Sequence, residues 1–86
     1  MKKMERILKA MANRRRLAIL KYLKDAKEAS VGNIAGKIKL SFKSTSKHLA
    51  VLSAVDILEK EQRSLSVFYR LAANQNLVVK QIFSII

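Results

Sequence analysis

Two helical patterns separated by a very short break occupy the middle of the chain. Ser30 is the predicted N-cap of a short helix over 31–38, in which apolar residues recur at steps of three and four. After a brief turn at 39–40, Ser41 is the predicted N-cap of the longest helix, over 42–54. Two helices joined by so short a turn must pack against each other, which is typical of the helix-turn-helix motif.

Further helices are predicted on both sides of this motif. The spacing of apolar residues indicates a first helix over 2–11 and a second over 14–24, the latter with Asn13 as its N-cap. A polar break over 25–29 ends the second helix. Near the C-terminus, Asn74 is the predicted N-cap of a closing apolar helix.

After the longest helix the pattern changes from helical steps to alternation. The alternation predicts a strand over 65–71, with 58–62 as its partner and a hairpin tip near Arg63 and Ser64. The predicted fold is therefore a mainly α (α+β) winged helix-turn-helix, with four helices, a two-stranded β-hairpin wing and a C-terminal helix. Because no repeat or linker interrupts it, we expect residues 1–86 to form a single winged-helix DNA-binding domain.

The charge balance narrows the class of partner. Lys and Arg number 18 against six acids, a formal net charge of +12, which favours nucleic acid or an anionic membrane. No apolar run reaches the roughly 18 residues of a membrane span, so we expect a soluble, cytoplasmic protein that binds double-stranded DNA and no membrane.

The residues needed for most catalytic and metal chemistry are missing. Cysteine is absent, which excludes disulfides, thiolate metal sites and cysteine nucleophiles, and His48 is the only histidine. The chain has no Gly-rich phosphate loop and no carboxylate pair set among polar partners. We therefore expect no enzyme activity, no cofactor and no metal.

On a helical wheel, the longest helix separates into two sides. One side carries Phe42, Thr45, Leu49 and Leu52. Lys43, Ser44 and Lys47 point the opposite way and are candidates to contact base edges in the major groove. Exposed lysines are by themselves typical of a solvated surface, but this position in a strongly basic chain favours DNA contact. The predicted DNA contacts of this segment are Ser41, Lys43, Ser44, Thr45, Ser46, Lys47 and His48.

Four arginines are predicted to contact the DNA backbone or minor groove. Arg14, Arg15 and Arg16 lie at a helix N-terminus, where positive charge opposes the helix dipole unless a phosphate compensates it. Arg63 is expected at the hairpin tip, within reach of a minor groove. Solvation alone is the alternative for each of them.

The closing helix has more apolar residues than one buried face needs. They could complete the core of the same chain or form a dimer interface, and we expect a dimer.

Two segments resemble the ArsR/SmtB family of winged-helix repressors. They are ANRRRLAIL at 12–20 and, more specifically, LSFKSTSKHLAVL at 40–52, and the similarity extends from about Ile7 to Leu71. The resemblance implies a homodimer formed by the first and last helices, which binds an inverted repeat at promoters and releases it on an effector signal. The interface residues expected on this basis are Met4, Ile7, Leu8, Met11, Leu77, Val78, Ile82, Phe83 and Ile86.

The chain departs from the family at positions that matter for mechanism. Metal-sensing members have a Cys-Val-Cys pair where this chain has Ser30-Val31-Gly32, and the closing helix lacks the Asp/His ligand set of the other common metal site. The resemblance therefore implies a member that does not sense metal. Family members usually have Gly after the recognition helix and at the wing tip, where this chain has Val55-Asp56 and Arg63-Ser64.

Two functions are compatible with these features. The leading hypothesis is a sequence-specific, dimeric transcriptional repressor. The alternative is an architectural or non-specific nucleic-acid-binding protein, since phosphate contacts alone could hold so basic a chain on DNA.

Overall fold

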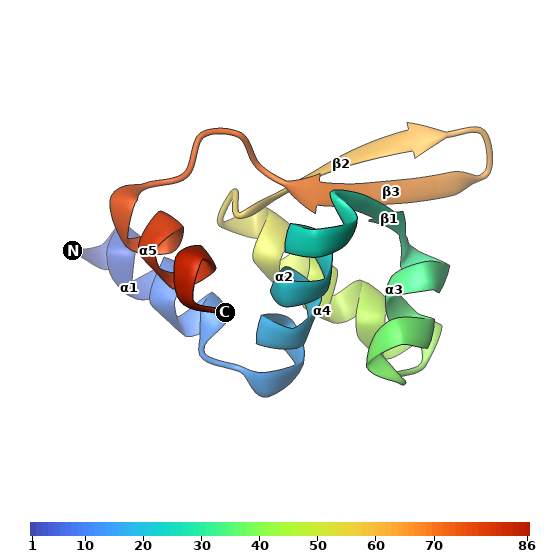
Figure 1. Cartoon of the computed structure of the whole chain (residues 1–86), viewed down its shortest axis with the longest axis horizontal. Coiled ribbons are helices and arrows are strands. Elements are labelled where there is room, and N and C mark those ends of the chain that lie inside the picture. Colours follow the sequence, from blue (N-terminus) through green and yellow to red (C-terminus); the bar gives the residue numbers. More distant parts are fainter.

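The predicted combination of helices and hairpin is confirmed by a computed structural model, which describes residues 1–86 (Figure 1). The elements in chain order are α1 (Lys2–Met11), α2 (Arg14–Ala26), β1 (Glu28–Ser30), α3 (Val31–Ile38), α4 (Phe42–Ala54), β2 (Leu58–Arg63), β3 (Ser66–Leu71) and α5 (Leu77–Ile85). The hairpin of β2 and β3 projects from one end of the molecule, and α1 and α5 lie at the opposite end (Figure 1). None of the helices is both long enough and apolar enough to cross a membrane.

Side-chain caps determine where four of the helices begin. Asn13, Ser30 and Ser41 each accept hydrogen bonds from backbone N–H groups two or three residues later, at 2.9–3.1 Å, as predicted. The predicted cap of the closing helix is wrong: Asn76 caps α5, accepting from the Val79 N–H at 2.9 Å, and Asn74 precedes the helix. Asn76 directly precedes the apolar run, so its oxygen reaches the first free N–H groups.

The sheet contains one strand more than the sequence predicts. β3 pairs with β2 along the hairpin and, on its other edge, with β1, giving the order β1-β3-β2. The predicted polar break over 25–29 is therefore partly wrong, because α2 continues to Ala26 and β1 begins at Glu28. Three residues are too few to show an alternating pattern, and the free edge of β3 supplies the pairing.

Four turns adopt left-handed backbone conformations without glycine. These positive-φ residues are Lys27, Lys39, Asp56 and Ser64. Asp56 follows α4 and Ser64 lies at the wing tip, the two places where the family usually has Gly. The turns thus keep the left-handed geometry at a cost of about 1 kcal/mol each.

The core lies between α2, α3 and α4 and one face of the sheet. Ile19, Leu20, Ile34, Leu49 and Leu52 are completely buried at its centre. α1 contributes three further core residues, and α5 contributes one. These are Ile7, Ala10, Met11 and Val79.

Thr45 is fully buried in this core, and its hydroxyl has no hydrogen-bond partner. We expect Thr45→Val to raise the free energy of unfolding by about 1 kcal/mol, because the variant keeps the shape and removes an unpaired buried polar group. Urea unfolding measures the change. Thr45→Ser is the matched control: it keeps the hydroxyl and loses a methyl group, so it should destabilise the protein by about 1 kcal/mol. Loss of stability in the valine variant would contradict this assignment.

Candidate DNA-binding surface

The two sides of α4 have opposite environments. Leu49 and Leu52 are buried against the core, whereas Lys43, Ser44 and Lys47 are exposed, as the helical wheel predicts. Ser41 is also exposed, and its hydroxyl oxygen caps the helix by accepting from the Ser44 N–H. The N-terminal half of α4 therefore presents two lysines and two hydroxyls to solvent. Such groups can donate to bases or phosphates.

Three other predictions for α4 need correction or refinement. Thr45 is completely buried, so the prediction that its side chain contacts DNA is wrong. Phe42, placed on the packing side of the wheel, is 63% exposed, because the first turn of α4 extends beyond the residues that cover the core. Ser46 is half-buried.

The three arginines at the start of α2 have different roles. Arg14 is exposed and Arg15 is partly exposed, and neither has an ion pair or side-chain hydrogen bond. Arg16 instead donates from Nε to the Ala10 carbonyl oxygen at 2.5 Å and from Nη1 toward Nδ1 of His48 at 3.2 Å. Its guanidinium is thus engaged within the protein, against the prediction of a phosphate contact, and links α1, α2 and α4.

His48 is the polar end of this link. A guanidinium can only donate, so Nδ1 of His48 accepts and the ring is neutral, with its proton on Nε2. Burial, together with the positive charges of Arg16 and Arg15, lowers the pKa of His48 below its ordinary value of 6.5. The ring is therefore uncharged at neutral pH.

Arg63 was predicted to lie free at the wing tip, and this prediction is wrong. Arg63 ends β2, forms a two-pronged ion pair with Glu28 of β1 at 2.5 and 3.0 Å, and contacts Glu61 at 3.1 Å. Its guanidinium also lies 4.7 Å from the ring centre of Phe68. Arg63 lowers the pKa of both carboxylates, and they raise the pKa of Arg63. The sequence signal for this network was the pair of acids in β2, Glu59 and Glu61. Leu65, not Arg63, is the exposed residue at the tip of the wing.

The network makes the sheet electrically neutral. The strands carry three acids, Glu28, Glu59 and Glu61, and three bases, Lys60, Arg63 and Arg70. The net charge of +12 therefore resides entirely on the helices and their connecting turns. A polyanion is therefore attracted to the helices and their turns rather than to the sheet.

These features define the class of protein. α3 and α4 form a helix-turn-helix, and β2 and β3 form its wing, so the fold is a winged helix-turn-helix (Figure 1). Residues 13–60, more than half of the chain, match the model of the arsR family of bacterial regulatory proteins. The protein belongs to the arsR family, which confirms the resemblance seen in its sequence.

The relatives are regulators, not enzymes, in agreement with the sequence prediction. The transcriptional activator HlyU of Vibrio cholerae is 41% identical over 69 residues, which span 80% of this chain and 63% of that relative, less than two thirds of its length. The structure of reduced HlyU from the same organism matches with a TM-score of 0.83 at 37% identity, covering 96% of this chain and 83% of the other. A homodimeric winged helix-turn-helix DNA-binding domain from Mycobacterium bovis, a possible ArsR-family transcriptional regulator, matches with a TM-score of 0.83 at 28% identity. The match covers 98% of this chain and 74% of the other.

The lowered pKa of His48 predicts how stability changes with pH. The unfolded chain takes up a proton on His48 at a higher pH than the folded protein, so the stabilisation is complete above about pH 6.5 and is lost as the pH falls. The urea concentration at the unfolding midpoint should therefore decrease as the pH is lowered from about 7.5 to about 5.5. The variant His48→Gln, which cannot titrate, should show a flatter profile. Equal slopes for both proteins would contradict the prediction.

Proposed function

We propose that this chain is a sequence-specific regulator of transcription that binds duplex DNA with the N-terminal half of α4 in the major groove. The observation that supports it most directly is the exposure of Lys43, Ser44 and Lys47 on one side of a helix whose other side is anchored by the buried Thr45, Leu49 and Leu52. Packing fixes the direction of these side chains before DNA arrives. Pre-oriented donors of this kind suit the recognition of base edges.

In this proposal, residues at the start of α2 contact the phosphate backbone of the DNA. Arg14 and Arg15 have no acidic partner in the protein, and a phosphate would offset the cost of placing positive charge at a helix N-terminus. Arg63 has a smaller part, because its charge is already balanced by Glu28 and Glu61. We propose that residues 1–86 act as one DNA-binding domain of this kind.

We also propose that the active form is a homodimer built on α1 and α5. Leu77 and Ile85 of α5 are 77% and 81% exposed, and Leu8 and Met4 of α1 are partly exposed. So much uncovered apolar surface on two helices at the same end of the molecule favours a second copy of the chain (Figure 1).

The burial of individual side chains revises the set of interface residues that was predicted from the sequence. Ile7 and Met11 are buried in the core of their own chain and cannot reach a partner. Ile82, Phe83 and Ile86 are half-buried against that core, so only their outer parts are available. Ile85, which belongs to the same apolar excess of the closing helix, is the more exposed residue. The relative from Mycobacterium bovis is described as homodimeric, which supports a dimer.

Repression is the direction of control that we propose. A compact domain bound at a promoter excludes other proteins from the same DNA by occupancy alone, and this needs no further contact. HlyU, by contrast, is described as an activator. We further propose that the effector is not a metal ion, because Ser30, Val31 and Gly32 replace the thiolate pair of metal-sensing members.

Selection from a random pool of duplex DNA at near-physiological salt tests the proposed function. Phosphate binding is weakened under these conditions, so base recognition must produce any enrichment. We expect an inverted repeat with half-sites about one helical turn apart. Absence of enrichment, with binding that disappears steeply as salt rises, would instead establish an architectural, non-specific DNA-binding protein.

The role of Lys47 can then be measured on the selected site. We expect Lys47→Ala to weaken binding to that site by about tenfold or more, and binding to random duplex by only a few-fold, because a base contact is lost as well as a charge. Lys2→Ala is the matched control, since it removes one lysine charge at the far end of the molecule. Equal losses on both DNAs would show that Lys47 contacts phosphate only.

Sedimentation tests the dimer. The wild-type chain should sediment at twice its monomer mass of 9.7 kDa at micromolar concentration. The double variant Leu77→Lys/Ile85→Lys should sediment as a monomer, because it places charge in the apolar interface. Leu65→Lys, at the wing tip, is the matched control: Leu65 is 98% exposed, and this variant should remain dimeric. A monomeric wild type would overturn the proposal.

A further inference from the structure

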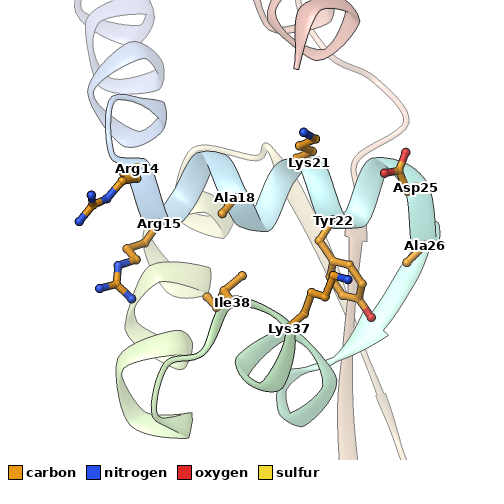
Figure 2. Close-up of a pocket in the computed structure, with 9 residues that line it drawn as sticks. All are labelled: Arg14, Arg15, Ala18, Lys21, Tyr22, Asp25, Ala26, Lys37 and Ile38. Atoms are coloured by element: carbon orange, nitrogen blue, oxygen red, sulfur yellow. The ribbon is translucent and has the colours of Figure 1, made fainter.

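A groove of about 780 Å³ is lined by residues of α2 and α3 (Figure 2). Ala18 and Tyr22 of α2 and Ile38 of α3 provide its apolar lining. Tyr22 and Lys37 point toward one another from the two helices (Figure 2). The size is that of sites for small organic molecules, which range from about 300 to 1,000 Å³.

The charges around this groove are arranged unevenly along α2. Arg14, Ala18, Lys21 and Asp25 recur at steps of three and four and therefore share one side of the helix. Arg14 and Asp25 are roughly 16 Å apart along the axis, at about 1.5 Å per residue. One end of the groove is thus strongly basic, and the other end has its only acid.

The four cations that line the groove have no acidic partner. Arg14, Arg15, Lys21 and Lys37 take part in none of the ion pairs of the chain. Three of the six acids are engaged in the sheet instead, where Arg63 and Arg70 hold them. The groove therefore combines an apolar lining with unbalanced positive charge.

We propose that this groove binds a small amphipathic organic anion, with an aromatic or aliphatic body against Tyr22, Ala18 and Ile38 and a single carboxylate near Arg14 and Arg15. DNA phosphates could use the same arginines, but they would leave the apolar lining unused. An apolar body with one acidic group uses both features. Binding in the groove does not depend on the proposed function.

A consequence for DNA binding does rest on the proposed function. Arg14 and Arg15 are the proposed phosphate contacts, so a bound carboxylate competes with DNA for them. Because the coupling of two ligands is reciprocal, DNA weakens binding of the anion by the same factor. The anion is then an effector that releases the regulator from DNA.

Titration of the ¹⁵N-labelled protein with naphthalene-2-carboxylate tests the site without DNA. We expect saturable shifts of the backbone amides of residues 14–26 and 37–38. Naphthalene-2-carboxamide has the same body without the charge, and it should bind about tenfold more weakly. Equal affinity for the two probes, or shifts confined to α1 and α5, would overturn the proposal.

Two variants and one control confirm the location. Ala18 is exposed in the groove, so Ala18→Trp should cover the apolar lining between Tyr22 and Ile38 and abolish binding while leaving the fold intact. Arg14→Glu reverses a charge beside the proposed carboxylate position, so it should weaken binding of the carboxylate at least about tenfold and leave binding of the carboxamide unchanged. Lys2→Glu makes the same charge change far from the groove and should have no effect. Unchanged carboxylate binding by both groove variants would also overturn the proposal.

The DNA consequence is tested separately by adding the same probe to the complex with the selected site. Saturating carboxylate should lower DNA affinity several-fold in the wild type and not in Ala18→Trp. Binding of the probe without an effect on DNA would leave the site established and refute the competition for Arg14 and Arg15. Failure to bind DNA at all would refute the proposed function and leave the titration result intact.

Discussion

The arrangement depends on the burial of one side of α4. Leu49 and Leu52 are completely enclosed, and losing either side chain would cost about 2–5 kcal/mol, a large fraction of the 5–15 kcal/mol that stabilises a typical domain. Because side chains follow one another at fixed steps around a helix, this packing also fixes which residues face solvent. Lys43, Ser44 and Lys47 are therefore held outward by interactions in which they take no part.

The distribution of charge follows from a second set of contacts. Arg63 and Arg70 form ion pairs with Glu28, Glu59 and Glu61 within the sheet, so these acids do not offset the positive charge of the helices. These pairs are partly exposed, and their value for stability is small. Their larger effect is on the electrostatic field: the three-stranded sheet is neutral, and the helices with their connecting turns keep the whole excess charge.

Local signals in the sequence were sufficient for the helix-turn-helix. The bounds of α3 and α4 follow from Ser30, Ser41 and the apolar spacing, because capping and periodicity act within a few residues. β1 could not be predicted in this way, since its pairing depends on the free edge of β3, about 40 residues away. Arg63 was misplaced for the same reason: its partner Glu28 is brought near only by that pairing.

Thr45 and Arg16 show a different limit, which affects the functional site itself. Both residue types often contact DNA, and both positions lie in the segments predicted to contact it, but the tertiary contacts of these two side chains turn them into the protein. Arg16 turns inward to Ala10 and His48, so α2 is tied to α4 through a polar contact as well as through the core. Arg15 and Arg14, one and two residues earlier, do not join this contact and line the groove instead. The same three-arginine run thus ties α2 to α4 through Arg16 and leaves the unpaired charges of Arg14 and Arg15 at the groove.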